Sequence, residues 1–131
     1  MKVGIVIVSH QALGLDLLKA TESIVKQSTL FASVGVAPED SLEFTGEKIL
    51  QAISKVDQGE GVLILSDLFG ASPCNACKPY LKKGKVELVS GVNLPMVIKL
   101  FSMTQDFSLN DLANFIVDYG QRNILRGTNL V

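Results

Sequence analysis

The one histidine of the 131-residue chain, His10, stands where an imidazole could take part in proton or phosphoryl transfer. It follows the apolar run Val3–Val8 after a single serine, Ser9. In an open parallel sheet, ligand sites lie beyond the carboxyl ends of the strands. Position alone leaves two interpretations open, a catalytic imidazole at this rim or a hydrogen-bonded surface histidine.

A second group of reactive residue types comes after the apolar run Val62–Leu65. Asp67 supplies a carboxylate at the strand end, and Gly70 permits a tight turn. Ser72 and Pro73 then predict a helix start, with the serine hydroxyl at the N-cap and the proline at the first helical position. The free N–H groups of a helix start favour an anion, so this segment predicts a phosphoryl-binding loop. An ordinary loop with a polar cap is the alternative.

His10 and Asp67 together indicate nucleophilic chemistry at phosphorus. A carboxylate that holds one ring nitrogen leaves the other nitrogen presented outward. The chain has no GxxxxGK[ST] loop and no cluster of metal-ligand residues, so we expect neither a metal nor another cofactor. A Ser-His-Asp hydrolase built on Ser9 or Ser72 is a weaker alternative, because no GxSxG elbow is present.

Four short β-branched runs alternate with longer segments of helical period, and these elements must position the reactive residues. The expected strands are Val3–Val8, Phe31–Val36, Val62–Leu65 and Lys85–Val89. This alternation predicts an α/β fold with a doubly wound, mostly parallel open sheet of flavodoxin-like order 2-1-3-4. We expect one domain over residues 1–131, with a core of about residues 1–120 and a C-terminal tail, 123–131, that forms a last strand.

The helices are expected from apolar stripes and from capping residues. The stripes are Leu13, Leu17, Ala20 and Ile24; Leu42, Ile49, Ile53 and Val56; and Leu109, Leu112, Ile116 and Tyr119. The expected caps are Asp40 (paired with Glu43), Asn93 before a helix to about Ser102, and Ser108 (with Asp111).

Composition excludes several classes of protein. Lys and Arg number 12 against 13 Asp and Glu, which excludes the basic surface of a nucleic-acid-binding protein. No apolar run approaches the ~20 residues of a membrane-spanning helix. We therefore expect a cytoplasmic protein.

Cys74 and Cys77 form a C-x-x-C motif, which leaves a thiol-redox protein as an alternative to two cysteines that pack a helix onto the sheet.

Three segments resemble the enzyme IIA domain of the mannose-type (mannose/fructose/sorbose) family of the phosphoenolpyruvate:sugar phosphotransferase system. They are Ile5–His10, Gly61–Ala76 and Gly91–Met96, and their order and spacing match over almost the whole chain. The resemblance implies a phosphotransferase component that works through a phosphohistidine. In this family, the histidine that matches His10 takes a phosphoryl group from phosphorylated HPr and passes it to a histidine of enzyme IIB. The sugar is then phosphorylated as it crosses the membrane through the IIC and IID subunits.

The resemblance also assigns roles around the histidine. The acid matching Asp67 orients the imidazole, and the serine matching Ser72 receives phosphoryl oxygens together with nearby backbone N–H groups. We expect Gly70, Ala71 and Ser9 to add binding contacts. Family members often have two glycines before the Ser-Pro pair, and Ala71 replaces the second one here. Alanine disfavours a positive φ, so we expect an ordinary backbone conformation at Ala71.

The resemblance further implies a homodimer in which the C-terminal strand, here residues 123–131, pairs with the neighbouring subunit's sheet. We expect enzyme IIB to be a separate chain and the protein to associate peripherally with a membrane sugar permease. Two relatives with different functions stay open: the phosphoryl-donor subunit of a dihydroxyacetone kinase system, and a regulatory IIA-like domain read by a transcription regulator.

Overall fold

The structure, a computed structural model, describes residues 1–27 and 29–130. Its centre is a parallel sheet of β1 (Gly4–His10), β2 (Phe31–Val36), β3 (Val62–Ser66) and β4 (Val86–Ser90) in the order β2-β1-β3-β4. This confirms the predicted α/β class and strand order. β1 lies inside the sheet between β2 and β3, and it extends two residues beyond the predicted strand, as far as His10.

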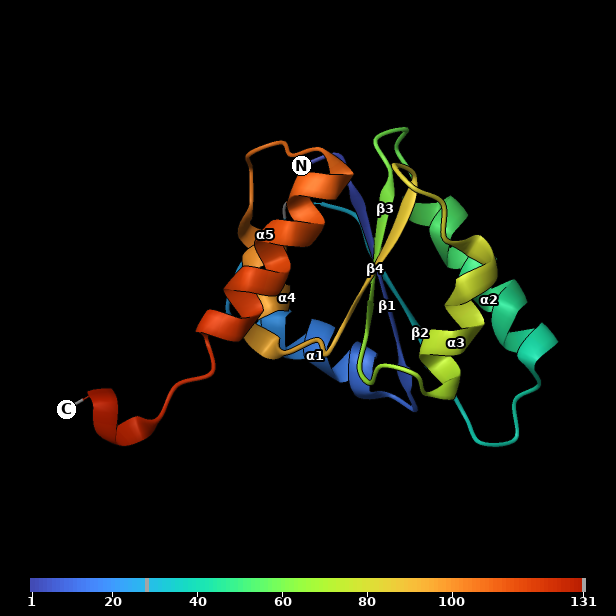
Figure 1. The fold of residues 1–131 in the computed structure, drawn as a ribbon, viewed down its shortest axis with the longest axis horizontal. Helices are drawn as coiled ribbons and strands as arrows, with labels where there is room; N and C mark the ends of the chain where they lie inside the picture. The colour runs from blue at the N-terminus through green and yellow to red at the C-terminus, as the bar shows by residue number, and fades with distance from the viewer. Residues whose placement is uncertain (28, 131) are drawn as a thin grey trace.

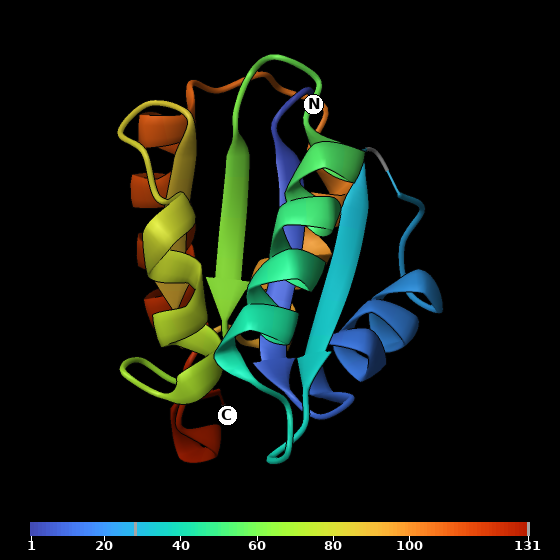
Figure 2. The ribbon, with the colours of Figure 1, turned by 90° about the vertical axis from the view of Figure 1, so that its right-hand side faces the viewer.

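Within the residues that the structure describes, five α-helices cover the two faces of the sheet. α1 (Leu13–Glu22), α4 (Leu94–Ser102) and α5 (Leu109–Arg122) lie on one face, and α2 (Leu42–Val56) and α3 (Ser72–Cys77) lie on the other, as Figures 1 and 2 show. A short 3₁₀ helix, η1 (Lys78–Tyr80), continues α3, and another, η2 (Gly127–Leu130), lies in the tail.

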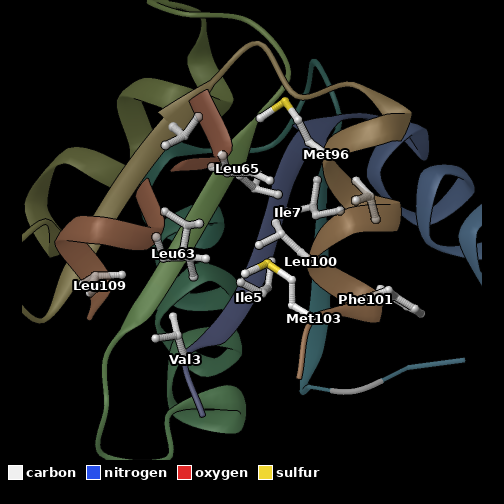
Figure 3. Close-up of a cluster of buried hydrophobic side chains, with 14 of the residues drawn as sticks. Val3, Ile5, Ile7, Leu63, Leu65, Met96, Leu100, Phe101, Met103 and Leu109 are labelled. Carbon is white, nitrogen blue, oxygen red and sulfur yellow. The ribbon is translucent and has the colours of Figure 1, made fainter. Parts of the chain in front are cut away.

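The alternation of side chains along β1 divides the core into two clusters. Ile5 and Ile7 pack with α4 and α5, where Figure 3 shows them beside Leu100 and Met103. Val6 and Val8 belong to the other cluster, under α2 and α3. Because successive strand residues point to opposite faces, His10 shares the face of Val6 and Val8, and Ser9 shares the face of Ile7.

Two of the three predicted caps outside the site are confirmed, and one is wrong by a residue. Asn93 Oδ1 accepts from the Met96 N–H and Ser108 Oγ from the Asp111 N–H, both at 3.1 Å. The cap of α2 is Ser41, whose Oγ accepts from the Phe44 N–H at 3.0 Å. Asp40 is the predicted cap, but its carboxylate accepts the Ala37 N–H instead and so closes the preceding turn.

The expected apolar stripes are only partly buried. The inner members of the second and third stripes lie in the core, among them Ile49, Ile53 and Ile116. The outer members of the first and second stripes, Leu13, Ile24 and Leu42, are exposed to solvent. Ile24 lies beyond α1, which ends at Glu22, so it never joins the helix face predicted for it.

Within residues 123–130 of the single chain the expected C-terminal strand does not form, and Val131 lies outside the described residues. Residues 123–130 leave α5 as a loop and end in η2, and Figure 1 shows the tail pointing away from the sheet. A strand needs a neighbouring edge for its N–H and C=O groups, and along this path the tail meets no edge of its own sheet. Its apolar side chains Ile124, Leu125 and Leu130 are consequently exposed.

Candidate functional site

The carboxyl ends of the two central strands bring His10 and Asp67 together, although they are 57 residues apart in sequence. His10 is the last residue of β1, and Asp67 directly follows β3, whose Ser66 is paired with Val8. His10 Nδ1 lies 2.8 Å from Asp67 Oδ2, and the His10 backbone N–H donates to the same oxygen at 3.0 Å. One carboxylate oxygen thus holds both the ring and the backbone of the histidine.

This contact determines how the imidazole is presented. With the proton on Nδ1 donated to Asp67, Nε2 carries the free lone pair, and the ring is about half exposed, at 49%. The Asp67 side chain, in contrast, is only 9% exposed. The pair therefore combines a buried carboxylate that orients the ring with a nucleophilic nitrogen that a partner molecule can reach.

The surroundings of Asp67 keep it ionised. Burial by itself would raise the pKa of this carboxyl, but the hydrogen bonds from the His10 N–H and ring, with the electrostatic attraction between the carboxylate and the ring, outweigh burial and lower the pKa below its ordinary value. The second oxygen, Oδ1, is buried and has no hydrogen-bond partner among residues 1–27 and 29–130. Within that part of the chain, the buried carboxylate depends mainly on His10 for compensation.

The loop after Asp67 turns sharply and starts α3 one residue earlier than predicted. Gly70 has φ +79°, and its carbonyl accepts from Asn75 Nδ2 at 2.8 Å. Ala71 is the N-cap, with an extended backbone (φ −77°) and a carbonyl that accepts the Asn75 N–H at 2.8 Å. The ordinary conformation expected for Ala71 is confirmed.

Ser72 is therefore the first helical residue and not the N-cap, which corrects the prediction. An N-cap needs a non-helical backbone, and the loop supplies it at Ala71. Among the described residues, no side-chain hydrogen bond caps α3, and Ser72 is exposed. The Ser72 hydroxyl is therefore not used as a cap of this helix.

His10 and Ser72 line the same cavity of about 440 Å³, between the end of β1, the end of β2 and the first turn of α3. Its lining residues are His10, Gln11, Val36, Ala37, Pro38, Asp40, Leu42, Thr45, Ser72, Pro73 and Ala76. Sequence reasoning missed the contribution of the end of β2 and of the loop after it, from Val36 to Asp40. The residues after a strand are the signal that led to His10 and Asp67, and the same signal at the end of β2 would have found this wall.

Ser9 lies away from this cavity. Its side chain is buried on the opposite face of β1, where Oγ accepts the Gly14 N–H at 2.8 Å and contacts the His10 carbonyl at 3.3 Å. Ser9 thus supports the start of α1. This geometry removes Ser9 as a nucleophile activated by His10, because the two side chains point to opposite faces.

The segment Gly91–Met96 also lies outside the lining of the His10 cavity. Asn93 caps α4, and Met96 is buried in the core under α5. The segment therefore serves as a turn and helix start and lies apart from the His10 cavity.

The cysteine pair is poorly suited to redox chemistry. Cys74 and Cys77 are free thiols, 1% and 0% exposed. Burial, together with the proximity of Cys74, raises the pKa of the Cys77 thiol to about 12. A redox-active thiol needs an accessible sulfur with a lowered pKa, so packing is the better interpretation of this C-x-x-C motif.

Two features of other protein classes do not occur in the described residues. No helix within residues 1–27 and 29–130 is long and apolar enough to cross a membrane. Over the same residues, no group of three or more His, Cys, Asp or Glu side chains is arranged to hold a metal ion.

Comparisons with known proteins point in the same direction as the site. Residues 4–117 match the family model EIIA-man, described as "PTS system fructose IIA component". Over 126 residues the chain is 30% identical to the mannose-specific EIIAB component of the phosphotransferase system (PTS) of Escherichia coli K12. That alignment covers 95% of this chain but 39% of the relative, so the chain spans about two fifths of that protein's length.

A shorter relative and a solved structure match over nearly their whole lengths. The PTS fructose-specific EIIA component of Bacillus subtilis is 24% identical over 92% of this chain and 84% of its own. The mannose/sorbose-specific IIA subunit from Enterococcus faecalis superposes with a TM-score of 0.85 at 26% identity, over 96% of this chain and 95% of that one. Given the family match over residues 4–117, the chain belongs to the mannose-type EIIA family of phosphotransferase-system components.

Proposed function

We propose that this protein is a phosphoryl carrier of a sugar phosphotransferase system and that His10 is its phosphorylated residue. The observation that carries the proposal is the 2.8 Å contact between His10 Nδ1 and Asp67 Oδ2, which leaves Nε2 exposed as the nucleophile. Membership of the EIIA family supports the same function.

This geometry supports the following transfer step. The lone pair of Nε2 forms a new N–P bond while the bond between phosphorus and the donor breaks, and the donor keeps that electron pair. The Nδ1 proton stays in its hydrogen bond to Asp67, whose negative charge stabilises the positive charge that develops on the ring. The Ser72 hydroxyl, which lines the same cavity as His10, is the proposed neutral donor to the phosphoryl oxygens, together with the Gly70 N–H of the preceding loop. The Ala71 N–H donates to the Leu68 carbonyl at 3.4 Å and would have to be shared with the phosphoryl group. No Lys or Arg among the described residues lines this cavity. Neutral donors stabilise the phosphoryl group during transfer without binding it too tightly, which suits a carrier that must release it.

The proposed donor is phosphorylated HPr, and the proposed acceptor is a histidine of enzyme IIB, which passes the group to a sugar entering through the membrane subunits IIC and IID. On this proposal residues 1–131 act as a single IIA domain in the cytoplasm, peripherally associated with a sugar permease. The exposed apolar tail, with Ile124, Leu125 and Leu130, supports a homodimer in which the tail pairs with a second copy.

The experiment is phosphoryl transfer from phosphoenolpyruvate through enzyme I and HPr, read by intact mass and by mapping of the acid-labile phosphate. We expect one phosphate, on His10, and none on the His10→Ala variant. Thr104→Ala, at an exposed position outside the cavity lining, serves as the control and should be labelled like the wild type. A labelled His10→Ala variant, or an unlabelled wild type beside active HPr, would show that the proposal is wrong.

A further inference from the structure

The turn between β1 and α1 has an unusual backbone directly after His10. Gln11 has φ +49°, and it is the only non-glycine residue with a positive φ in the described part of the chain. Its N–H donates to the Val36 carbonyl at 2.9 Å, so the turn is attached to the end of β2. Residues other than glycine adopt this conformation only when the surrounding structure imposes it.

Gly35 directly precedes Val36 on β2 and allows the turn after His10 to attach there. It is paired with Ser9 in the sheet register. A Cβ atom added to Gly35 would overlap the Gln11 carbonyl oxygen and lie 3.2 Å from the Gln11 carbonyl carbon. The overlap is with backbone, which cannot rotate away as the end of a side chain can. The turn can lie against β2 only because position 35 has no side chain.

Gly35 is also held from the side of α2. Lys48 Nζ donates to the Gly35 carbonyl at 2.8 Å, and the same ammonium lies 3.6 Å from Asp40 Oδ2. Asp40 in turn accepts the Ala37 N–H at 2.9 Å. This network fixes the end of β2 at the place where the Gln11 carbonyl rests on it.

His10 therefore lies between two attachments. On one side, its N–H and ring are bound to Asp67 after β3; on the other, the following peptide is bound to Val36 and rests on Gly35. We propose that Gly35 is a positioning residue for phosphoryl transfer. Because Gly35 has no side chain, the Gln11 peptide can lie directly against β2, and this position keeps the His10 ring hydrogen-bonded to Asp67. This inference rests on the proposed function of His10.

The test compares two glycine-to-alanine variants that both create a backbone overlap. Gly35→Ala places its Cβ against Gln11, next to His10. Gly4→Ala is the matched control, because its Cβ would lie 2.7 Å from the Val56 carbonyl carbon at the opposite end of β1. His10 is the sole histidine, so its two ring nitrogens give an unambiguous ¹H–¹⁵N spectrum that reports the Nδ1–H contact with Asp67.

We expect Gly35→Ala to change the His10 ring-nitrogen shifts and to slow phosphoryl acceptance from HPr by about 10- to 100-fold, the scale of a small misplacement at a reacting atom. Gly4→Ala should lower the melting temperature and leave the ring-nitrogen shifts and the acceptance rate near those of the wild type. In the Gly35→Ala background, Gln11→Gly should restore much of both, because glycine lets the carbonyl at position 11 move without strain.

Lys48→Met provides a test that adds no atoms at the turn and keeps the helix. It removes the donor to the Gly35 carbonyl, and we expect a smaller change in the same direction; this variant decides the question should Gly35→Ala not fold. The inference is overturned if Gly35→Ala leaves the His10 nitrogen shifts unchanged and the acceptance rate within about twofold of wild type. If Gly35→Ala does not fold, the same result in Lys48→Met overturns it. Equal effects in Gly4→Ala would also overturn it. A wild type that accepts no phosphate refutes the proposed function instead, while the nitrogen spectra still decide the positioning.

Discussion

Asp67 Oδ2 accepts two hydrogen bonds from the same residue, one from the His10 ring at 2.8 Å and one from the His10 backbone N–H at 3.0 Å. Because ring and main chain share one acceptor, the imidazole is fixed relative to the end of its own strand. A hydrogen bond to the ring alone would leave the ring free to swing with the adjoining turn.

Replacing this carboxylate should slow the reaction without unfolding the protein. Asp67→Asn keeps the shape of the side chain but removes its charge, and we expect phosphoryl acceptance to fall about 10- to 100-fold, from the ~1.5–3 kcal/mol that a hydrogen bond to a charged group is worth. Quench-flow labelling from phosphorylated HPr measures the rate. Asp118→Asn, which removes an exposed carboxylate paired with Arg122, is the matched control and should react at the wild-type rate. An Asp67→Asn variant as fast as this control would exclude an orienting role.

The lowered pKa of Asp67 predicts how stability depends on pH. Since the folded protein holds this carboxyl ionised more strongly than the unfolded chain does, its contribution is present above the unfolded value of about 4 and is lost as the pH falls through the lower folded value. Urea unfolding of wild type and Asp67→Asn between pH 7 and pH 3 measures it. Below about pH 4 the difference in unfolding free energy should shrink as the pH falls. A difference that grew as the pH fell below about 4 would contradict the direction of this pKa shift.

The thiols of the two cysteines should be unreactive in the folded protein. With both thiols buried and the pKa of Cys77 raised to about 12, we expect no alkylation by iodoacetamide at pH 8 under native conditions and two additions after unfolding in urea. Intact mass counts the additions. Rapid alkylation of the native protein, or a reversible disulfide between Cys74 and Cys77 under mild oxidation, would support the thiol-redox alternative instead.

The tail offers a test of self-association. Its exposed side chains Ile124, Leu125 and Leu130 would be covered if the tail paired with a second copy, so deletion of residues 123–131 should convert a dimer to a monomer. Light scattering gives the mass of each form. The substitution Ile24→Ser, which removes an exposed apolar side chain elsewhere, is the control and should leave the mass unchanged. The same mass for the intact and shortened chains would exclude dimerisation through the tail.

Much of this protein is determined by local sequence pattern. Apolar runs of strand length that alternate with helical stripes determine a parallel α/β sheet, and the order β2-β1-β3-β4 is consistent with right-handed crossovers. Since the inner strands of such a sheet end at one edge, the sequence was sufficient to place His10 beside Asp67. The alternation of strand side chains along β1 is also enough to place Ser9 on the face opposite to His10.

Tertiary structure decided what depends on residues that meet only after folding. Nothing local to Gly35 shows that the Gln11 carbonyl rests on it, because the two belong to segments brought together by sheet pairing. Ala71 is the N-cap of α3 because the path of the loop gives this residue a non-helical backbone. The hydroxyl of Ser72 does not determine where the helix begins. The described part of the tail, residues 123–130, forms no strand for the same physical reason: an extended segment becomes a strand only where another edge offers hydrogen bonds to it.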